Sequence, residues 1–154
     1  MMYVYHAVVR RIVDGDTVDC DIDLGFDQWI HRARVRLKGV DAPETRTLDL
    51  VEKAYGLMVA RRVEELLPVG STVTLFSHEY RRDGFGRIIG DFEMSNGNLL
   101  THALLEERLV TKWNPDDRVG MHIQERENLE WILTNGRADP EWAKEMRVLL
   151  ESER

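Results

Sequence analysis

Residues 13–24 of the chain read VDGDTVDCDIDL. In the second half of this segment apolar side chains alternate with aspartates, which is the period-two pattern of a strand with one buried face. The preceding Asp14-Gly15-Asp16 is a turn-type tripeptide, because glycine permits backbone conformations that other residues avoid. The segment therefore predicts a turn that leads into a strand over Thr17–Leu24, with two carboxylates at the strand end.

Four further segments have the composition of strands. Tyr3–Val13 is rich in β-branched and aromatic residues, and it is expected to pair with the strand that follows the turn. Ile30–Lys38 alternates again, and Val73–His78 and Arg87–Glu93 are two strands separated by glycine-rich sequence. The expected inward residues of Ile30–Lys38 are Ile30, Ala33, Val35 and Leu37.

Apolar residues at helical spacing predict four helices. The longest covers Thr47–Leu67 and ends before Pro68 and Gly70. The other three are a short helix capped by Asn98, a helix over Met121–Thr134, and a last one that begins at Asp139-Pro140 with an apolar stripe of Trp142, Met146 and Leu149.

This order of elements predicts an α+β fold, a five-stranded OB-type β-barrel with three to four packed helices. At 154 residues the chain is expected to form a single domain over residues 1–154, in which residues 139–154 are a C-terminal helical extension. We expect the apolar stripe of that extension to pack on the core.

The net charge of −7 argues against generic binding to nucleic acid, because phosphates are usually met by a basic surface. No segment approaches the roughly 20 apolar residues of a membrane-spanning helix, and the first residues lack the pattern of a secretory signal, so we expect a cytoplasmic protein without a membrane partner. The single cysteine, Cys20, is expected to be a buried free thiol.

Three segments that begin or end strands carry the residues suited to catalysis or metal binding. They are Asp14–Thr17, Arg36–Thr45 and Asp83–Arg87. Strand ends at the rim of a barrel can bring distant parts of the sequence together without disturbing the core. The carboxylates and carbonyls of these segments are hard oxygen ligands, suited to calcium or magnesium, whereas the five histidines are dispersed and argue against zinc.

Together the three segments contain the parts needed to hydrolyse a phosphodiester. That reaction requires an oriented water, a base for its proton, and positive charge around the phosphorus. Asp16 and Asp41 can hold a divalent cation and Glu44 can accept the proton. Arg36 and Arg87 can grip phosphate oxygens with forked hydrogen bonds. Each residue also has a structural alternative: an ordinary turn, a favourable charge at a helix start, or a surface arginine.

The joint occurrence of these motifs resembles the staphylococcal nuclease-like, or thermonuclease, family. Its turn is present as Val13–Thr17, and its second segment is present as Arg36, Asp41 and Pro43-Glu44-Thr45. Its aromatic-Gly-Arg motif is present as Phe85–Arg87. The three motifs stand in the family's order, and the resemblance runs from about Tyr3 to Trp113.

The resemblance implies calcium bound by Asp16, Asp41 and the backbone carbonyl of Ala42, with Asp14 close by. It implies Glu44 as the general base. Arg36 and Arg87 are implied as the pair that stabilises the transition state. It further implies cleavage of DNA and RNA to leave 3'-phosphate ends, and an OB barrel with helices. Protein partners are not implied.

The chain departs from the family's pattern in its substrate-binding positions. Gly84 and Phe85 replace a lysine-tyrosine pair, and only Trp113 stands near the position of the expected tyrosines. An acidic chain must then hold its substrate with a local basic strip. We expect that strip to consist of Arg32, Arg34, Arg36, Lys38, Arg81, Arg82 and Arg87.

Two other functions remain compatible with the residues. Related OB-fold domains can serve as non-catalytic nucleic-acid-binding or scaffold modules, because a fold can persist after its chemistry is lost. Hydrolysis of a phosphodiester outside nucleic acid is the second. The presence of every implied catalytic residue favours the nuclease.

Overall fold

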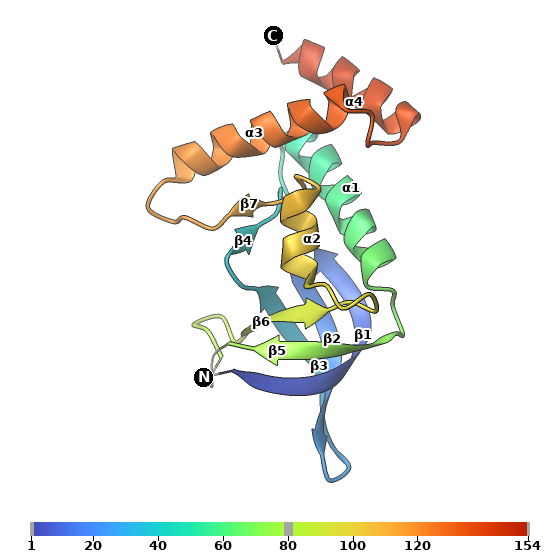
Figure 1. Ribbon diagram of the computed structural model, residues 1–154. Helices are drawn as coiled ribbons and strands as arrows, with labels where there is room; N and C mark the ends of the chain where they lie inside the picture. The colour runs from blue at the N-terminus through green and yellow to red at the C-terminus, as the bar shows by residue number, and fades with distance from the viewer. Residues whose placement is uncertain (1, 79–81, 154) are drawn as a thin grey trace.

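The computed structural model describes residues 2–78 and 82–153. Five strands close into a barrel in the order β1-β2-β3-β6-β5 (Figure 1). Their bounds are Tyr3–Asp14 for β1, Thr17–Gly25 for β2, Gln28–Leu37 for β3, Thr72–Ser77 for β5 and Ile88–Glu93 for β6. All pairs are antiparallel except β3 with β6, which is parallel. The five-stranded barrel expected from the sequence is thus confirmed.

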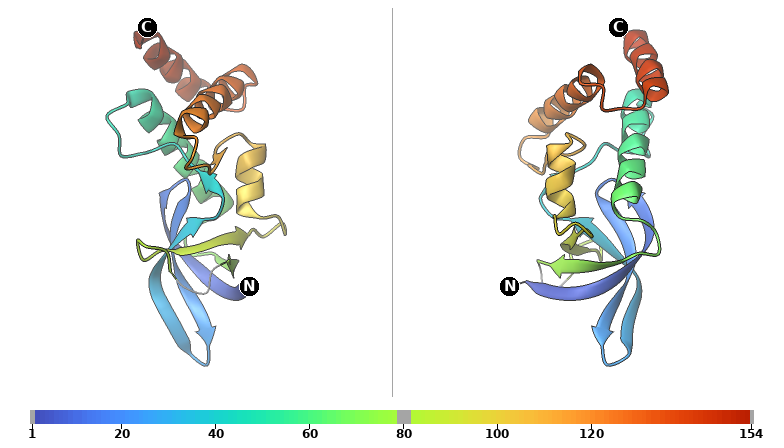
Figure 2. Two further views of the ribbon diagram at one scale, coloured as in Figure 1. Left: turned by 90° about the vertical axis from the view of Figure 1, so that its left-hand side faces the viewer. Right: turned by 45° about the vertical axis from the view of Figure 1, so that its right-hand side comes forward.

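Four helices lie in the described part of the chain, and they gather at one end of the barrel (Figures 1 and 2). They are α1 (Leu50–Leu66), α2 (Leu100–Glu106), α3 (Arg118–Thr134) and α4 (Pro140–Ser152). The β2–β3 hairpin projects from the opposite end. None of the described helices is both long and apolar enough to cross a membrane.

A second sheet of two short strands joins the barrel to the helices. Its strands are β4 (Val40–Asp41) and β7 (Thr111–Lys112), which pair antiparallel with Asp41 opposite Thr111. The sequence did not predict this sheet, because two residues are too few to show an alternating pattern. It ties the end of β3 to the segment that precedes α3 (Figure 1).

Strand β2 shows how the alternation produces the core. Val18, Cys20 and Ile22 are buried inside the barrel, while Leu24 is 42% exposed on the projecting hairpin. Burial, with smaller contributions from the neighbouring aspartates, raises the pKa of the Cys20 thiol to about 12. The expected buried free thiol is therefore present, and it is held in its unreactive protonated form.

The predicted starts of the first two helices were wrong. The longest helix begins at Leu50 rather than Thr47, because Asp49 accepts hydrogen bonds from the first backbone amides and caps it. The short helix is not capped by Asn98: Leu99 stands at the cap position without a side-chain hydrogen bond. The backbone N–H of Asn98 donates instead to Asn96 within the preceding turn.

Of the two C-terminal helices, α3 departs from its predicted start and α4 begins as predicted. Helix α3 starts at Arg118, one turn earlier than expected, because Asp117 accepts a hydrogen bond from the backbone N–H of Gly120. Helix α4 begins at Pro140 with Asp139 as its cap, as expected. Met146 is buried in the hydrophobic core.

Helix α4 packs against α1. The indole Nε1 of Trp142 donates to the carbonyl of Ala54 over 3.3 Å. On the other side, the guanidinium of Arg147 donates to the carbonyl of Leu133 at the end of α3. The apolar stripe of residues 139–154 thus contributes to the core.

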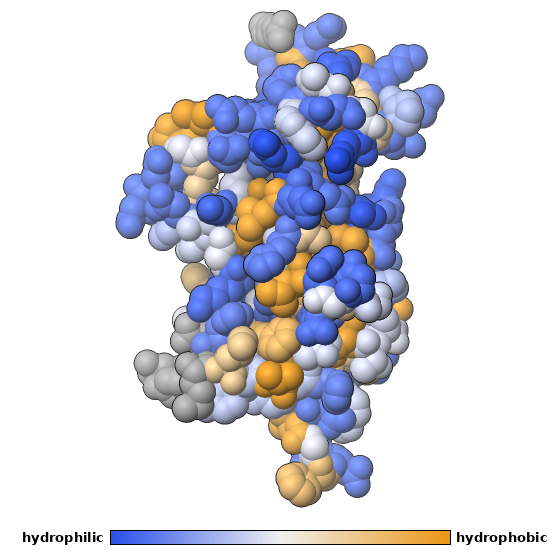
Figure 3. Space-filling view, in the orientation of Figure 1, coloured by the Kyte–Doolittle hydropathy of each residue, from blue (hydrophilic) through white to orange (hydrophobic). Residues whose placement is uncertain are grey.

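Most of the surface in the view of Figure 3 is hydrophilic, with hydrophobic patches over the barrel and α2. The tip of the projecting hairpin is also apolar. Phe26 at this tip is 99% exposed, and Leu24 and Trp29 are about half as exposed.

Two glycines allow α1 to approach the rest of the molecule closely. A Cβ at Gly15 would lie 2.5 Å from Cγ1 of Val59. A Cβ at Gly56 would lie 2.6 Å from the carbonyl oxygen of Glu44 and 2.7 Å from that of Pro43. The loop that carries Glu44 therefore rests directly on the backbone of α1.

We expect Gly56→Ala to lower the free energy of unfolding. At an open helical position the same change gains up to about 1 kcal/mol, but here the added methyl would overlap two carbonyl oxygens, and overpacking costs about 1–3 kcal/mol. Urea unfolding measures the difference. Gly84→Ala is the control, since no atom lies within 4 Å of a Cβ at that position. A Gly56→Ala protein as stable as the parent would contradict the close packing.

Candidate active site

A cavity of about 750 Å³ lies between the end of the barrel, the β4–β7 sheet and α3. This volume is within the roughly 300–1,000 Å³ of ligand-sized clefts. Five of the six site residues expected from the sequence line this cavity: Asp16, Arg36, Asp41, Glu44 and Arg87. Ala42 is buried and contributes to the site through its backbone N–H.

Asp16 stands at the turn between β1 and β2 and is only 8% exposed. Its Oδ1 accepts a hydrogen bond from the hydroxyl of Thr17 over 2.8 Å, and its Oδ2 accepts from the backbone N–H of Ala42 over 2.9 Å. Its own carbonyl accepts from the N–H of Leu37. The carboxylate is thus fixed to both the turn and the segment after β4.

Arg36 bridges the two carboxylates expected to bind metal. Its Nη2 lies 3.2 Å from Oδ1 of Asp41 and 3.7 Å from Oδ2 of Asp16. Its Nη1 donates to the carbonyls of Leu37 and Val40, over 2.9 and 2.7 Å. With 12% of its side chain exposed, this guanidinium is held in one orientation.

Asp41 belongs to β4, and its charge is destabilised by its surroundings. Burial and the negative charge of Asp16 raise its pKa to about 6, although the charge of Arg36 opposes the rise. Two carboxylates that face the same space repel one another. The pair is therefore suited to a cation that neutralises both.

Glu44 lies in the loop between β4 and α1, where it is exposed and lines the cavity. Its backbone N–H donates to Oε1 of Glu52 over 3.3 Å. Partial burial raises the pKa of its carboxyl, as do the charges of Asp16 and Asp14. A raised pKa makes a carboxylate a better proton acceptor.

Asp14 is the other carboxylate of the turn. It lines the cavity, and its Oδ1 accepts a hydrogen bond from the hydroxyl of Thr45. The hydrogen bond ties the turn before β2 to the loop that carries Glu44. Asp14 therefore helps to position the loop.

Arg87 is oriented by Asp83. The backbone N–H of Arg87 donates to Oδ1 of Asp83 over 2.8 Å, and its Nε donates to Oδ2 over 3.0 Å. Although burial opposes it, these bonds and one from the backbone of Phe85 lower the pKa of Asp83. The guanidinium carbon lies 5.1 Å from the centre of the Phe85 ring. This clamp leaves the outer edge of the guanidinium for a ligand.

Helix α3 forms one wall of the cavity, which the sequence did not predict. Four of its residues line the cavity: Arg118, Met121, His122 and Glu125. They are spaced at i, i+3, i+4 and i+7, so they share one face of the helix. The spacing of the three polar residues among them was the available signal, although a solvated face gives the same pattern.

Glu125 is the most perturbed carboxyl of this wall. Burial raises its pKa to about 7, and the negative charges of Glu52 and Asp41 add to the rise. Nδ1 of His122 lies 3.8 Å from its Oε2. The side of the cavity formed by α3 therefore carries a carboxyl as well as the guanidinium of Arg118.

The expected basic strip is only partly assembled. Arg36, Lys38 and Arg87 line the cavity. Arg34 is paired with Asp19 over 2.9 Å, which neutralises its charge. Arg32 lies on an irregular part of β3, where its φ is 53°.

The remaining two strip residues lie between β5 and β6. Arg82 donates to the carbonyl of Gly86 within its own turn. Arg81 lies outside the described residues.

The side chains that line the cavity determine whether it can hold a metal ion. In the part of the chain that the structure describes, no three His, Cys, Asp or Glu side chains converge as a metal cluster. Asp16 and Asp41 do face one another across Arg36, however, and seven carboxylates line a cavity that contains four arginines and lysines. An oxygen-rich site with this excess of negative charge fits a hard cation that keeps several water ligands.

The fold and this site together define an OB-type barrel with an acidic cleft and two oriented guanidinium groups at one end. The family model described as staphylococcal nuclease homologue matches residues 34–130, more than half of the 154-residue chain. The chain belongs to the staphylococcal nuclease family.

Several relatives share this part of the sequence. Thermonuclease of Staphylococcus intermedius is 31% identical over 123 residues, which cover 77% of this chain and 67% of that protein. SPbeta prophage-derived endonuclease YokF of Bacillus subtilis is 29% identical over 104 residues, 68% of this chain and 33% of the relative. Endonuclease YncB of the same species is 29% identical over 105 residues. The chain spans a third of YokF and 46% of YncB.

The raised carboxyl pKa values predict how stability depends on pH. Asp41, Glu44 and Glu125 hold protons in the folded protein at pH values where the unfolded chain releases them. The folded state then binds more protons, so the free energy of unfolding falls as the pH rises from about 5 to 7. Urea unfolding in metal-free buffer at several pH values measures this fall.

The variant Glu125→Gln tests the upper end of that window. Its carboxyl has a pKa of about 7, so removing it should flatten the fall between about pH 6 and 7. Glu64→Gln, on the exposed face of α1, is the matched control. A free energy that rises with pH in this range would show that the cavity carboxyls are not destabilised by one another.

Proposed function

We propose that this protein is a metal-dependent nuclease that hydrolyses phosphodiester bonds of DNA and RNA. The observation that carries the proposal is the convergence of Asp16, Asp41, Glu44, Arg36 and Arg87 from three separate segments on one cavity. Family membership supports it, as do relatives named as a thermonuclease and as endonucleases.

Glu44 is proposed as the general base. It lines the cavity and is exposed, so water has access to it, and its carboxyl has a raised pKa. It would take the proton of the attacking water as the new P–O bond forms. The bond from phosphorus to the 5' oxygen breaks, and that oxygen leaves as a 5'-hydroxyl after taking a proton from solvent. The hydrogen bond from its backbone to Glu52 and the packing of its loop on Gly56 fix its position.

Arg36 and Arg87 are proposed to bind the phosphate. Arg87 presents the edge of its guanidinium that Asp83 does not use, which can donate two hydrogen bonds to phosphate oxygens. Arg36 already uses both terminal nitrogens within the protein, so it would contribute mainly positive charge at a fixed place. Both charges favour the transition state, in which the phosphoryl oxygens gather negative charge.

Asp16, Asp41 and the carbonyl of Ala42 are proposed to hold calcium. When bound, the ion would supply positive charge that polarises the scissile phosphate. Calcium is favoured over magnesium because two carboxylates in a loop-bordered site suit its flexible coordination better than a strict octahedron. The products are proposed to carry 3'-phosphate ends, as the family resemblance implies.

A non-catalytic OB-fold module is the alternative function. Such a module would not need a base, a carboxylate pair and oriented arginines in one cavity, and all of these are present here.

We further propose that residues 1–154 act as one domain, because the extension over residues 139–154 contributes Met146 to the core.

Glu44→Gln should lower the cleavage rate by about 10²- to 10⁴-fold, the usual loss when a general base is removed. The fold should be unaffected, since the hydrogen bond to Glu52 uses only the backbone of Glu44. Initial rates on single-stranded DNA and far-UV circular dichroism test both points. Glu64→Gln on α1 is the matched control. A rate within twofold of the parent would exclude Glu44 as the base.

Chelation of calcium should abolish cleavage, and added calcium should restore it. Magnesium should restore less activity, because its coordination geometry is stricter. Digestion of labelled DNA with excess chelator, then with each metal, measures this, and analysis of the fragment ends tests for 3'-phosphates. Undiminished digestion in chelator would refute the metal dependence.

A further inference from the structure

Four arginines and lysines line the cavity, but only two of them are engaged by the protein. Arg36 is bound by two carbonyls and Asp41, and Arg87 is bound by Asp83. In the described part of the chain the side chains of Lys38 and Arg118 make no hydrogen bond or ion pair, and both residues are exposed. Lys38 and Arg118 are therefore free to bind a ligand.

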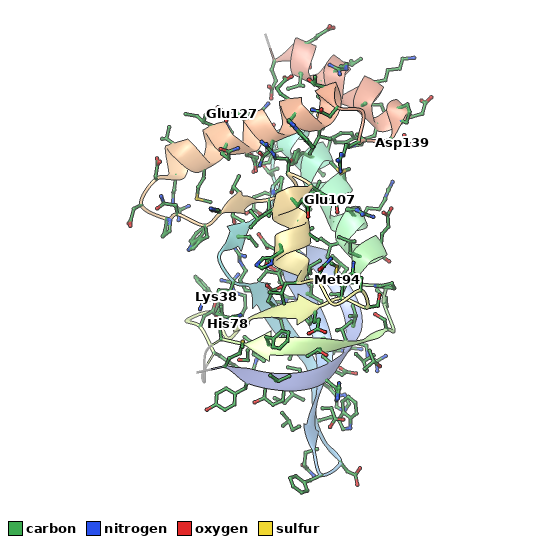
Figure 4. All side chains as sticks on the ribbon, in the orientation of Figure 1. Lys38, His78, Met94, Glu107, Glu127 and Asp139 are labelled. Carbon is green, nitrogen blue, oxygen red and sulfur yellow. The ribbon has the colours of Figure 1, made fainter. Side chains whose placement is uncertain are left out.

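The two free cations lie on different walls. Lys38 directly follows β3 and lies at the edge of the barrel, where it is labelled in Figure 4. Its backbone is fixed, because its N–H donates to the carbonyl of Gly90 over 2.9 Å. Arg118 is the first residue of α3, which crosses above the β4–β7 sheet (Figures 1 and 4). The proposed catalytic groups line the same cavity as Lys38 and Arg118.

Binding of a nucleic-acid strand here faces an electrostatic problem. The cavity contains seven carboxylates, and the whole chain has a net charge of −7. A cation between Asp16 and Asp41 would offset only the centre of this charge. Phosphates on either side of the scissile one would still meet Asp14, Glu52 and Glu125.

We infer that Lys38 and Arg118 bind the two phosphates that flank the scissile phosphodiester, one on each side. This inference rests on the proposed nuclease function and adds the substrate class: a strand with at least three consecutive phosphates. Lys38 contributes a compact point charge, whereas Arg118 contributes a fork that can bind two phosphate oxygens. Neither residue takes part in the chemical step, so they determine affinity and not turnover.

Substrates of different length distinguish this role from simple balancing of the carboxylates. The first is a dinucleotide with a single phosphodiester and no other phosphate. The second is a tetranucleotide with modified outer linkages that resist hydrolysis, so that cleavage occurs only at its central bond. Steady-state cleavage of both is measured for the parent, Lys38→Gln and Arg118→Gln in calcium.

On the tetranucleotide we expect each variant to raise KM about three- to tenfold and to leave kcat within about twofold, since a lost charge-assisted contact in solvent has this size. On the dinucleotide we expect both constants to match the parent. Binding of a longer single strand to each variant in the Glu44→Gln background should also show a salt slope reduced by about 0.7.

Lys144→Gln and Arg11→Gln are the controls. Each removes the same charge from an exposed position outside the cavity, and neither should change KM on either substrate. Thermal unfolding checks that all variants fold.

Equal losses on the two substrates would overturn the inference, because the residues would then act through the catalytic groups. A KM on the tetranucleotide that neither variant changes would also overturn the inference. In that case cleavage by the parent protein would leave the proposed function standing. A parent protein that cleaves neither substrate would overturn the proposed function itself.

Discussion

The geometry of the site depends on the guanidinium of Arg36. It donates to the carbonyls of Leu37 and Val40, which closes the tight turn between β3 and β4, and the same group reaches both Asp16 and Asp41. Without this charge the two carboxylates would face each other across a partly buried space. Removing one partner of such a group leaves an uncompensated charge, which is far more costly than the net worth of the intact group.

The sequence predicted the barrel because its strands carry local signals, as in the alternation of Val18, Cys20 and Ile22. It predicted the five cavity-lining site residues from motifs, each of which lies within ten residues. What it could not predict were contacts between distant segments. Asp41 pairs with Thr111, 70 residues away, through strands of two residues that have no periodic pattern. The α3 wall was missed because its polar stripe resembles any solvated helix face.

Helix α3 makes the cavity a product of the whole chain. Arg126 on this helix reaches Oδ2 of Asp49, the cap of α1, over 3.3 Å, and its other terminal nitrogen reaches Glu153 at the end of α4 over 3.0 Å. Asp49 in turn begins the helix on which the Glu44 loop rests. One arginine thus links the last helix, the α3 wall and the loop of the proposed base.

The cavity contains more carboxylates than cations because several segments of the chain converge on it. A protein that only needed stability would not place Asp41 and Glu125 where burial and like charge raise their pKa values to about 6 and 7. Functional sites commonly hold such destabilised groups, and the rest of the fold offsets their cost. Here the offset comes from the closed barrel and the helices packed on its end. The unfavourable carboxylates are thereby kept together although their charges repel one another.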